Sequence, residues 1–249
     1  MSVSAPLAPI IPDWPAPARV RAACSTREGG VSVGAYAGLN IGRSGGDESA
    51  AVDENRRRLF SALALPQPPE WIHQVHGSRA VQVPSTPPEQ DADACYTQVP
   101  GVVCAVQAAD CLPVLFCDDD ATVVAAAHAG WRGLAAGVLE NMIAALPVAP
   151  QRLLAWLGPA IGPEAFEVGE DVRRAFVASD PAAASCFRVG KAADKYYADL
   201  FALARSRLAA AGVSRVYGGG ISTHADPARF YSYRRDGVTG RMIALIWLA

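Results

Sequence analysis

Two histidines and one cysteine lie where extended segments of this chain are expected to end. His76 directly precedes Gly77, Cys111 lies at the junction of two apolar runs, and His128 follows the apolar run 123–127. Side chains at such positions can be presented at the edge of a sheet. Two imidazoles and one thiolate form a recognised ligand set for zinc, and three protein ligands leave one coordination position for water or substrate. If the three side chains converge, the residue types indicate a catalytic metal site.

The spacing of these residues matches no general metal-binding motif, so a second interpretation stays open. In it, the two histidines are hydrogen-bonded core residues and Cys111 is an inert buried thiol. His73 is a poorer ligand candidate than His76. Residues three apart in an extended segment point to opposite faces, so His73 and His76 should not share an ion. Gly77 marks the end of that segment and favours His76.

The elements that would position these residues follow from hydrophobic periodicity. Strands are predicted over 19–25, 71–75, 79–83, 101–108, 112–117, 122–127, 153–157, 215–218 and 242–247, and helices over 52–63, 135–146, 171–178 and 198–211. Strands and helices are interleaved without a strict βαβ period, which predicts an α/β fold of the mixed α+β kind.

Two segments are expected to be loops. Residues 26–34 have the glycine density of a loop whose backbone comes close to another part of the molecule. The proline-rich segment 84–93 is expected to be a surface loop. Residues 1–17, rich in proline and small residues, are expected to be a loosely held tail or edge segment, followed by a single catalytic domain over 18–249.

Composition narrows the class of protein. Of the 249 residues, 51% are hydrophobic and 18% are charged, and the formal net charge is -2. A balance this close to neutral argues against nucleic acid as a partner, because phosphate-backbone binding needs a dominant basic field. The apolar runs stop far short of the ~20 residues of a membrane helix, and no signal peptide is recognised. A cytoplasmic protein without membrane attachment is expected, and its six cysteines, which form no CxxC pair, should be reduced thiols, most of them buried.

Seven blocks of sequence resemble the YfiH-like, laccase-domain family. They are Arg27-Glu28-Gly29-Gly30-Val31-Ser32, Gln74-Val75-His76-Gly77, Ala109-Asp110-Cys111-Leu112-Pro113-Val114, His128-Ala129-Gly130-Trp131-Arg132-Gly133, Gly158-Pro159-Ala160-Ile161-Gly162-Pro163, Phe166-Glu167-Val168-Gly169 and Phe230-Tyr231-Ser232-Tyr233-Arg234-Arg235-Asp236. They run in family order from near residue 19 to the end of the chain. The resemblance implies a single-domain fold with mixed sheets flanked by helices, and a zinc site of His76, Cys111 and His128.

The resemblance also implies an activity. It is that of a zinc-dependent purine nucleoside phosphorylase acting on adenosine, inosine, guanosine and methylthioadenosine, with adenosine deaminase as a second activity. The implied partners are therefore a purine nucleoside and phosphate, and a monomer or weak homodimer is expected. The family generally lacks a histidine at the place of His73, which fits a core or supporting position. It often has Cys-Thr where this chain has Ser222-Thr223, so no catalytic cysteine is expected there.

Four further residues are candidates for the reaction. Arg27 and Arg132 lie in glycine-rich turns and are predicted to bind phosphate, since a guanidinium matches phosphate bidentately. The alternative for each is a surface salt bridge. Asn40 is a candidate for hydrogen bonding to sugar or base, or else a turn former. Asp110 is predicted to orient a ligand or take a proton, or else to cap a strand end. Glu167, Tyr233 and Arg234 match the family without an assigned role, and packing is the default expectation for Tyr233.

Rival functions use the same residues. Cys111 and His128 could form a metal-free hydrolase, such as a peptidoglycan-editing amidase, because a thiol near an imidazole can act as a nucleophile. Copper is the alternative metal, and family members have been described as polyphenol oxidases. A blue-copper centre usually adds an axial methionine, and Met1, Met142 and Met242 lie outside the ligand blocks. Four histidines are too few for a multicopper centre, so phenol oxidation would be a side activity.

Overall fold

The computed structural model of the chain describes residues 6–84 and 90–249. Its strands are β1 (Val20–Cys24), β2 (Ala80–Gln82), β3 (Ala94–Thr97), β4 (Val103–Ala108), β5 (Leu112–Asp118), β6 (Val124–Ala129), β7 (Leu153–Leu157), β8 (Glu167–Gly169), β9 (Phe187–Val189), β10 (Lys195–Ala198), β11 (Arg215–Gly218) and β12 (Met242–Leu248). Its α-helices are α1 (Ser49–Ala62), α2 (Trp131–Ala135), α3 (Val138–Ala145), α4 (Glu170–Val177), α5 (Leu200–Ala210) and α6 (Tyr233–Asp236). Short 3-10 helices occur at Gly34–Tyr36, Pro150–Arg152 and Pro181–Cys186.

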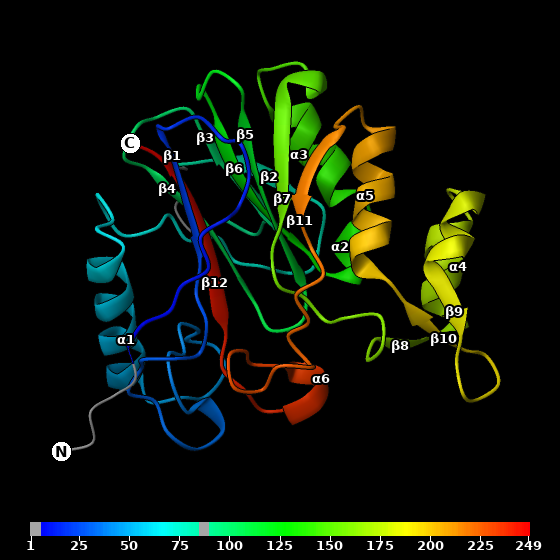
Figure 1. Ribbon diagram of the computed structural model, residues 1–249, viewed down its shortest axis with the longest axis horizontal. Helices are drawn as coiled ribbons and strands as arrows, with labels where there is room; N and C mark the ends of the chain where they lie inside the picture. Colours follow the sequence, from blue (N-terminus) through cyan, green and yellow to red (C-terminus); the bar gives the residue numbers. More distant parts are fainter. Residues whose placement is uncertain (1–5, 85–89) are drawn as a thin grey trace.

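Two sheets are stacked in the centre of the molecule (Figure 1). The larger has the order β11-β7-β5-β6-β3-β2, and the smaller has the order β1-β12-β4. In the larger sheet the outer pairs β11–β7 and β2–β3 are parallel and the inner pairs are antiparallel, whereas the smaller sheet is antiparallel throughout. Helix α1 covers the outer face of the smaller sheet, and α2, α3 and α5 cover the outer face of the larger sheet (Figure 1). The mixed α/β class predicted from the sequence is confirmed.

The continuous apolar runs of the sequence are explained by this layering. Along β5, Leu112, Val114 and Phe116 pack against the helices, while Leu115 and Cys117 pack between the sheets. The strand β12 alternates in the same way: Ile243, Leu245 and Trp247 face α1, and Ala244, Ile246 and Leu248 face the larger sheet. Because both faces of these strands are buried, neither shows the polar alternation of a solvent-facing strand.

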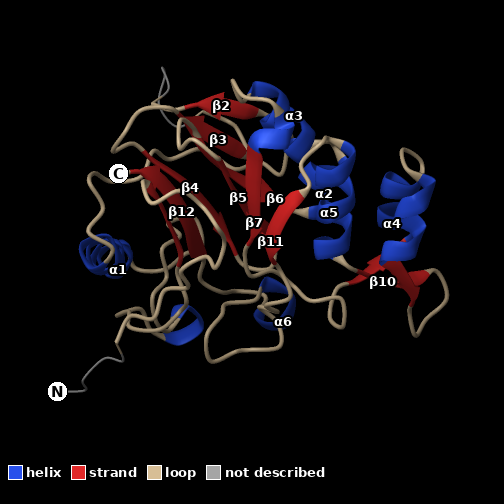
Figure 2. Ribbon diagram, turned by 45° about the horizontal axis from the view of Figure 1, so that its top comes forward, coloured by secondary structure: helices blue, strands red, loops and turns tan. Residues whose placement is uncertain are grey.

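A third sheet, of order β8-β10-β9, stands apart from the two stacked sheets together with α4. Figure 2 shows this unit beyond α5, on the opposite side of the molecule from α1. Asp199 links β10 of this unit to α5. Its side chain accepts a hydrogen bond from Ala202 N at 3.0 Å and so caps the N-terminus of α5.

Most predicted elements agree with the structure to within a few residues, but two do not. The predicted strand 71–75 is wrong: within it only His73 makes an isolated bridge, to Asp91, and Glu70 just before it bridges to Cys104. The predicted helix 135–146 is broken, because Gly137 adopts φ +89° and separates α2 from α3. The strand β3 and the strands of the sheet β8-β10-β9, each three or four residues long, were not predicted.

The predicted loops and the tail have mixed outcomes. The close approach expected for 26–34 is confirmed, since a Cβ on Gly30 would lie 2.1 Å from Gly38 O. The surface loop expected over 84–93 is wrong at its end, where Asp93 is fully buried; residues 85–89 lie outside the described residues. Residues 1–5 of the predicted tail also lie outside them, while Ile10 N donates to Cys24 O at 2.8 Å at the edge of β1.

The cysteines of the chain are unpaired, and most of them are buried. All six cysteines are free, as expected, and Cys24, Cys95, Cys104 and Cys117 are buried between the two stacked sheets. Burial raises the pKa of the Cys24 thiol to about 12, so it is not a nucleophile at neutral pH.

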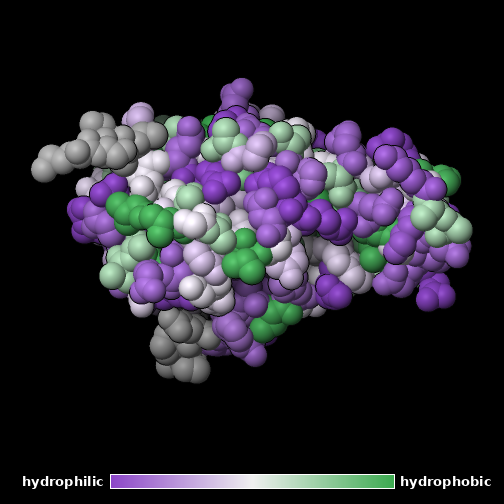
Figure 3. Space-filling model, turned by 90° about the horizontal axis from the view of Figure 1, so that it is seen from below, coloured by the Kyte–Doolittle hydropathy of each residue, from purple (hydrophilic) through white to green (hydrophobic). Residues whose placement is uncertain are grey.

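No described helix has the length and hydrophobicity needed to span a membrane. The face seen from below carries hydrophobic side chains only in small separate groups (Figure 3).

Candidate metal centre and adjoining cavities

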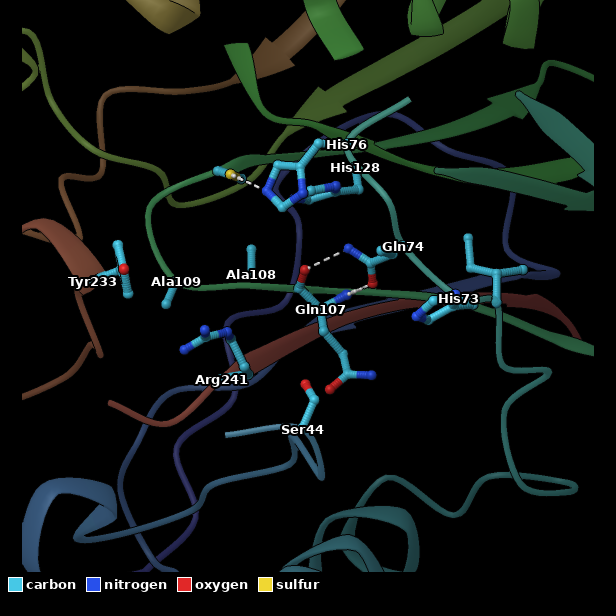
Figure 4. Close-up of a pocket in the computed structure, with 12 residues that line it drawn as sticks. Ser44, His73, Gln74, His76, Gln107, Ala108, Ala109, His128, Tyr233 and Arg241 are labelled. Atoms are coloured by element: carbon cyan, nitrogen blue, oxygen red, sulfur yellow. Dashed lines mark hydrogen bonds between the residues drawn. The ribbon is translucent and has the colours of Figure 1, made fainter. Parts of the chain in front are cut away.

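His76, Cys111 and His128 converge at one end of the stacked sheets (Figure 4). The Cys111 Sγ lies 3.9 Å from His76 Nε2, and the two imidazole rings are 4.9 Å apart between centroids at an angle of 80°. One ligand atom from each residue lies within 4.8 Å of those of the other two. Within residues 6–84 and 90–249, this is the group of histidine, cysteine and carboxylate side chains that is close enough to hold an ion.

An unusual backbone conformation orients the side chains of His76 and Cys111. His76 has φ +59°, and Asp110, which precedes Cys111 in the turn between β4 and β5, has φ +89°. Positive φ is uncommon for residues with a Cβ and persists only where surrounding contacts enforce it. His128 is held differently, as the penultimate residue of β6, in register with Pro113 of β5.

For His76, the enforcing contacts come from Asp93, a fully buried carboxylate directly before β3. Its oxygens accept hydrogen bonds from the backbone amides of Val75, His76 and Gly77 at 3.2, 3.0 and 2.6 Å. Oδ1 also lies 2.8 Å from His128 Nδ1, which leaves Nε2 of that ring for an ion. Asp93 thus supports two of the three candidate ligands, and it takes the amide of Val75, the last residue of 71–75, out of any strand ladder.

Two glycines provide the space in which the cluster is packed. A Cβ on Gly130 would lie 2.9 Å from Cys111 Sγ and 3.2 Å from His76 Cδ2. A Cβ on Gly133 would lie 2.5 Å from Gly77 O, so α2 packs directly against the loop that carries His76. The glycine pattern after His128 therefore has a steric cause at both positions.

The donor set fits a tetrahedral ion such as zinc. Bond lengths of about 2.3 Å to sulfur and about 2.0–2.1 Å to nitrogen require donors roughly 3.3–3.6 Å apart, which small movements of the side chains would provide. The electrostatics also fit, since the sulfur is held as a thiolate. Burial raises the pKa of Cys111, but the charges and hydrogen bonds of His128 and His76 outweigh it and lower the pKa to about 6. Burial lowers the pKa of His128, whereas the Cys111 sulfur and Asp93 outweigh it and raise the pKa to about 9.

Two cavities meet at this cluster. The larger, of about 550 Å³, is lined by Ser44, Ile72, His73, Gln74, His76, Gln107, Ala108, Ala109, Cys111, His128, Tyr233 and Arg241. The smaller, of about 290 Å³, is lined by His76, Ala109, Asp110, Cys111, Trp131, Arg132, Ile161, Phe166, Leu200, Tyr233 and Arg234. His76, Ala109, Cys111 and Tyr233 line both cavities, so an ion on the cluster would be accessible from two sides.

Asp110 lies beside the cluster, but its carboxylate is directed elsewhere. It accepts hydrogen bonds from Thr223 Oγ1 at 2.6 Å, Ser232 Oγ at 2.9 Å and Arg234 N at 2.7 Å. These contacts tie the turn that carries Cys111 to α6 and its cap. Asp110 also lines the smaller cavity, so its predicted role in orienting a ligand or taking a proton stays a prediction.

Of the three residues predicted to contact phosphate or sugar, only Arg132 lines one of the two cavities. Arg27 donates to the carbonyl oxygens of Ala37 and Pro227 and lies over the Tyr231 ring, away from the residues that line the two cavities. Asn40 is also outside both linings, and its amide is fully used in local hydrogen bonds. Arg132 does line the smaller cavity, with its guanidinium stacked over the Trp131 ring at 4.4 Å.

His73 and Tyr233 depart from the packing roles expected for them. The His73 side chain is 71% exposed, and its Nδ1 lies 2.7 Å from Asp91 Oδ1, so it is neither a core residue nor part of the ligand cluster. Tyr233 is 62% exposed and forms part of the wall between the cavities. Arg234 donates to the carbonyl oxygens of Ala165 and Glu167, which anchors α6 to the segment before β8.

Sequence reasoning missed Asp93, Gln107 and Arg241. Asp93 lies in a polar run next to Asp91, and nothing in the sequence distinguishes the two carboxylates. Gln107 and Arg241 lie at the end of β4 and just before β12, where only the pairing of these strands brings them together. A polar residue at the end of an otherwise apolar run was the available signal for Gln107.

Comparisons with known proteins identify the family of the chain. Residues 21–249 match the family model described as multi-copper polyphenol oxidoreductase laccase. The chain is 52% identical over 240 residues to the purine nucleoside phosphorylase YfiH of Escherichia coli (strain K12), covering 96% of this chain and 98% of that protein. It is 53% identical over 239 residues to a purine nucleoside phosphorylase of Pseudomonas aeruginosa, with the same coverage. The crystal structure of the Neisseria meningitidis protein NMB0706 matches with a TM-score of 0.92 at 50% identity, covering 96% of this chain and 98% of that one. The chain therefore belongs to the YfiH-like laccase-domain family.

Proposed function

We propose that the chain is a zinc-dependent purine nucleoside phosphorylase. The observation that carries this proposal is a cluster of three candidate ligands, two imidazoles and one thiol, located where two cavities meet. The names of the relatives in Escherichia coli and Pseudomonas aeruginosa supply the substrate class. Adenosine, inosine, guanosine and methylthioadenosine are the proposed nucleosides.

His76, Cys111 and His128 would hold the zinc ion, with Nε2 of His128 as the donor because Nδ1 is bound to Asp93. Zinc at this position would supply a Lewis acid that stabilises negative charge on phosphate or on the departing base. Asp93 would keep the two histidines oriented, as carboxylates behind ligating histidines generally do. A thiolate ligand is available at neutral pH because His128 and His76 lower the pKa of Cys111.

In phosphorolysis, a phosphate oxygen forms a bond to the sugar C1′ while the C1′–N9 bond breaks. The electron pair of that bond goes to the purine, which takes up a proton, and the products are the free base and ribose 1-phosphate. The rings of Trp131, Phe166 and Tyr233 line the smaller cavity and offer faces on which a base can stack. Arg132 is at the same cavity, within the part of the site that would hold the base and sugar.

Adenosine deamination is proposed as a second activity of the same site. There, water adds to purine C6 and ammonia leaves, a reaction that also requires a position open to water beside the base. The two activities are distinguished by their products, since phosphorolysis of adenosine releases adenine and deamination releases inosine.

The decisive experiment combines metal analysis with turnover of inosine in the presence of phosphate. The purified protein should contain about one zinc per chain, and chelation should abolish hypoxanthine release until zinc is restored. Cys111→Ser should lose zinc and phosphorolysis together. Cys186→Ser is the matched control, because Cys186 is a partly buried thiol outside the ligand cluster. Retained phosphorolysis in metal-free Cys111→Ser protein would exclude the zinc mechanism.

A cysteine hydrolase, such as a peptidoglycan-editing amidase, is the second candidate. The observation that favours it is the Cys111, His128 and Asp93 arrangement, in which a low-pKa thiol faces an imidazole that a buried carboxylate orients. Inactivation by thiol alkylation without any effect of chelators would support the hydrolase. A copper-dependent polyphenol oxidase would instead require phenol turnover that survives zinc loading, together with a strong visible absorption.

A further inference from the structure

We propose that Arg241 binds the phosphate co-substrate at the end of the larger cavity opposite the metal centre, together with the side chains of Gln107 and Ser44. This inference rests on the proposed phosphorylase function and identifies the anion subsite within it. None of the three residues was a phosphate candidate from the sequence, where Arg27 and Arg132 were preferred.

The guanidinium of Arg241 is hydrogen-bonded within the described residues through Nη1 alone. Its Nη1 donates to Thr239 O at 2.9 Å and Gly240 O at 3.0 Å, which fixes the orientation of the plane. Nε and Nη2 make no hydrogen bond to any residue that the structure describes. Figure 4 shows the guanidinium on the side of the cavity where Tyr233 and Ala109 lie. An arginine held in this way can present a bidentate pair of N–H donors to a phosphate without first losing side-chain freedom.

Gly42 provides the space for the Arg241 side chain. A Cβ at position 42 would lie 2.7 Å from Arg241 Cγ and 3.4 Å from Gln107 Oε1, so both side chains lie against the same point of the glycine. Asn40 fixes this arrangement, since its Oδ1 accepts hydrogen bonds from Gly42 N at 3.0 Å and Arg241 N at 2.8 Å. Gly42 and Asn40 together fix the placement of Arg241, and Asn40 does so from outside the cavity.

Gln107 and Ser44 add neutral donors beside the arginine. The Gln74 side chain pairs with the backbone of Gln107 through two hydrogen bonds of 2.8 Å. The Gln107 side chain runs toward Ser44, and both residues line the larger cavity (Figure 4). Neither the Gln107 side-chain amide nor the Ser44 hydroxyl makes a hydrogen bond within the described part of the chain. Phosphate oxygens accept hydrogen bonds from all three types of donor.

The charge of the cavity favours an anion. The side chains that line it include Arg241 and no aspartate or glutamate, and the one anionic group among them, the Cys111 thiolate, belongs to the metal centre. Two further arginines lie close to Ser44 and Gln107: Arg43 is paired with Asp53, and Arg56 donates from Nε to Ile41 O at 3.0 Å and lies over the Trp71 ring. Arg27 is committed to carbonyl oxygens. Arg241 is thus the fixed positive charge that an anion entering the larger cavity would meet.

The test compares the intact zinc-loaded protein with its Arg241→Gln, Arg241→Lys and Arg57→Gln variants. Arg57 is an exposed residue of α1 paired with Glu54, so its loss controls for one surface charge. Direct binding of inorganic phosphate is measured by calorimetry, and KM is measured separately for phosphate and inosine. Arg241→Gln should weaken phosphate binding and raise KM for phosphate by about 10- to 100-fold, with KM for inosine changed less than about 3-fold. Arg241→Lys should fall in between, because lysine lacks the bidentate fork.

The outcomes separate this proposal from the proposed function. Phosphate binding to the wild type that is lost in Arg241→Gln supports the subsite even if no nucleoside is turned over. Phosphorolysis with an unchanged phosphate KM in Arg241→Gln overturns the subsite and leaves the enzyme assignment intact. Equal loss of phosphate binding in Arg57→Gln would also overturn it, as a general charge effect. Circular dichroism and zinc content verify that each variant is folded, and Gln107→Leu, with a smaller rise in phosphate KM, provides a second readout if Arg241→Gln does not fold.

Discussion

The Asp93 carboxylate lies 2.8 Å from Nδ1 of His128, and both side chains are buried, with exposed fractions of 0% and 3%. The same carboxylate accepts the three amides of the loop that carries His76. Burial raises the pKa of Asp93, but hydrogen bonds from His128 and from the loop amides outweigh it and hold the pKa below its usual value. One ionised side chain therefore organises two of the three candidate metal ligands.

Asp93→Asn should weaken zinc binding by about 10- to 100-fold, the range usual for the loss of a carboxylate behind a ligating histidine. In asparagine, an NH₂ group replaces one of the two acceptor oxygens. The backbone amides of the His76 loop and the His128 ring then lose part of the acceptor that they share. Competition with a chelator measures the affinity. Asp91→Asn is the matched control, because Asp91 contacts His73 at 2.7 Å but both side chains are about 70% exposed. Equal effects of the two substitutions would contradict the role of Asp93.

Gly133→Ala should reduce metal affinity although residue 133 is not a ligand. The new Cβ would lie 2.5 Å from Gly77 O, and since that atom is backbone, the His76 loop must shift. We expect at least a tenfold loss of zinc affinity and a loss of about 1–3 kcal/mol in the free energy of unfolding in urea. At Gly45 the nearest atom to a new Cβ is 3.4 Å away, so Gly45→Ala should leave metal affinity unchanged. A Gly133→Ala protein with wild-type zinc affinity would show that the packing is looser than the structure indicates.

Cys111 in the metal-free protein should react with iodoacetamide at unusually low pH. Its pKa is lowered to about 6, so the reactive thiolate is lost only as the pH falls through about 6 and is present throughout the neutral range. Mass spectrometry of the modified residue as a function of pH should give a half-maximal rate near pH 6. Cys117, whose pKa burial raises to about 12, provides an unreactive internal control. A rate for Cys111 that rises only above pH 8 would mean that His128 does not stabilise the thiolate.

Asp110→Asn should reduce stability more than it reduces metal binding. The carboxylate accepts three hydrogen bonds that join the Cys111 turn to α6, and weakening these charged hydrogen bonds should cost about 2–3 kcal/mol in urea unfolding. Asp53→Asn, which removes an exposed pair with Arg43, should cost less than about 1 kcal/mol. The zinc content at saturating metal should stay near one per chain. Loss of zinc with unchanged stability would instead support a direct role of Asp110 at the ligands.

The sequence predicted the strands and the ligand types more reliably than the supporting contacts. The strands β5, β7 and β12 are apolar on both faces, and their positions follow from composition over five to seven residues. The segment 71–75 was also predicted as a strand but forms no ladder, and the amides of Val75 and of the following His76 and Gly77 donate to Asp93 instead. Its conformation depends on a residue some 16 to 18 positions away, outside any local window.

Arg27 and Arg241 illustrate the same limit for binding residues. Arg27 lies in a glycine-rich turn that resembles an anion site, yet its guanidinium is used by carbonyl oxygens of Ala37 and Pro227. Arg241 lies in an unremarkable stretch before β12, yet its position over Gly42 directs it into the cavity. Whether an arginine is available to a ligand depends on which carbonyls the fold places beside it.

By itself, the sequence determined the mixed α/β class, the burial of the central strands and the presence of His76, Cys111 and His128 at element ends. These properties depend on residue types and on their spacing over a few neighbouring residues, and both can be read directly from the sequence. The tertiary structure alone decided that the three side chains converge, that Asp93 rather than Asp91 supports them, and that Arg241 faces the cavity. Such contacts join segments far apart in the chain, and they exist only once the two sheets and α2 are packed together, because packing brings those atoms within hydrogen-bonding range.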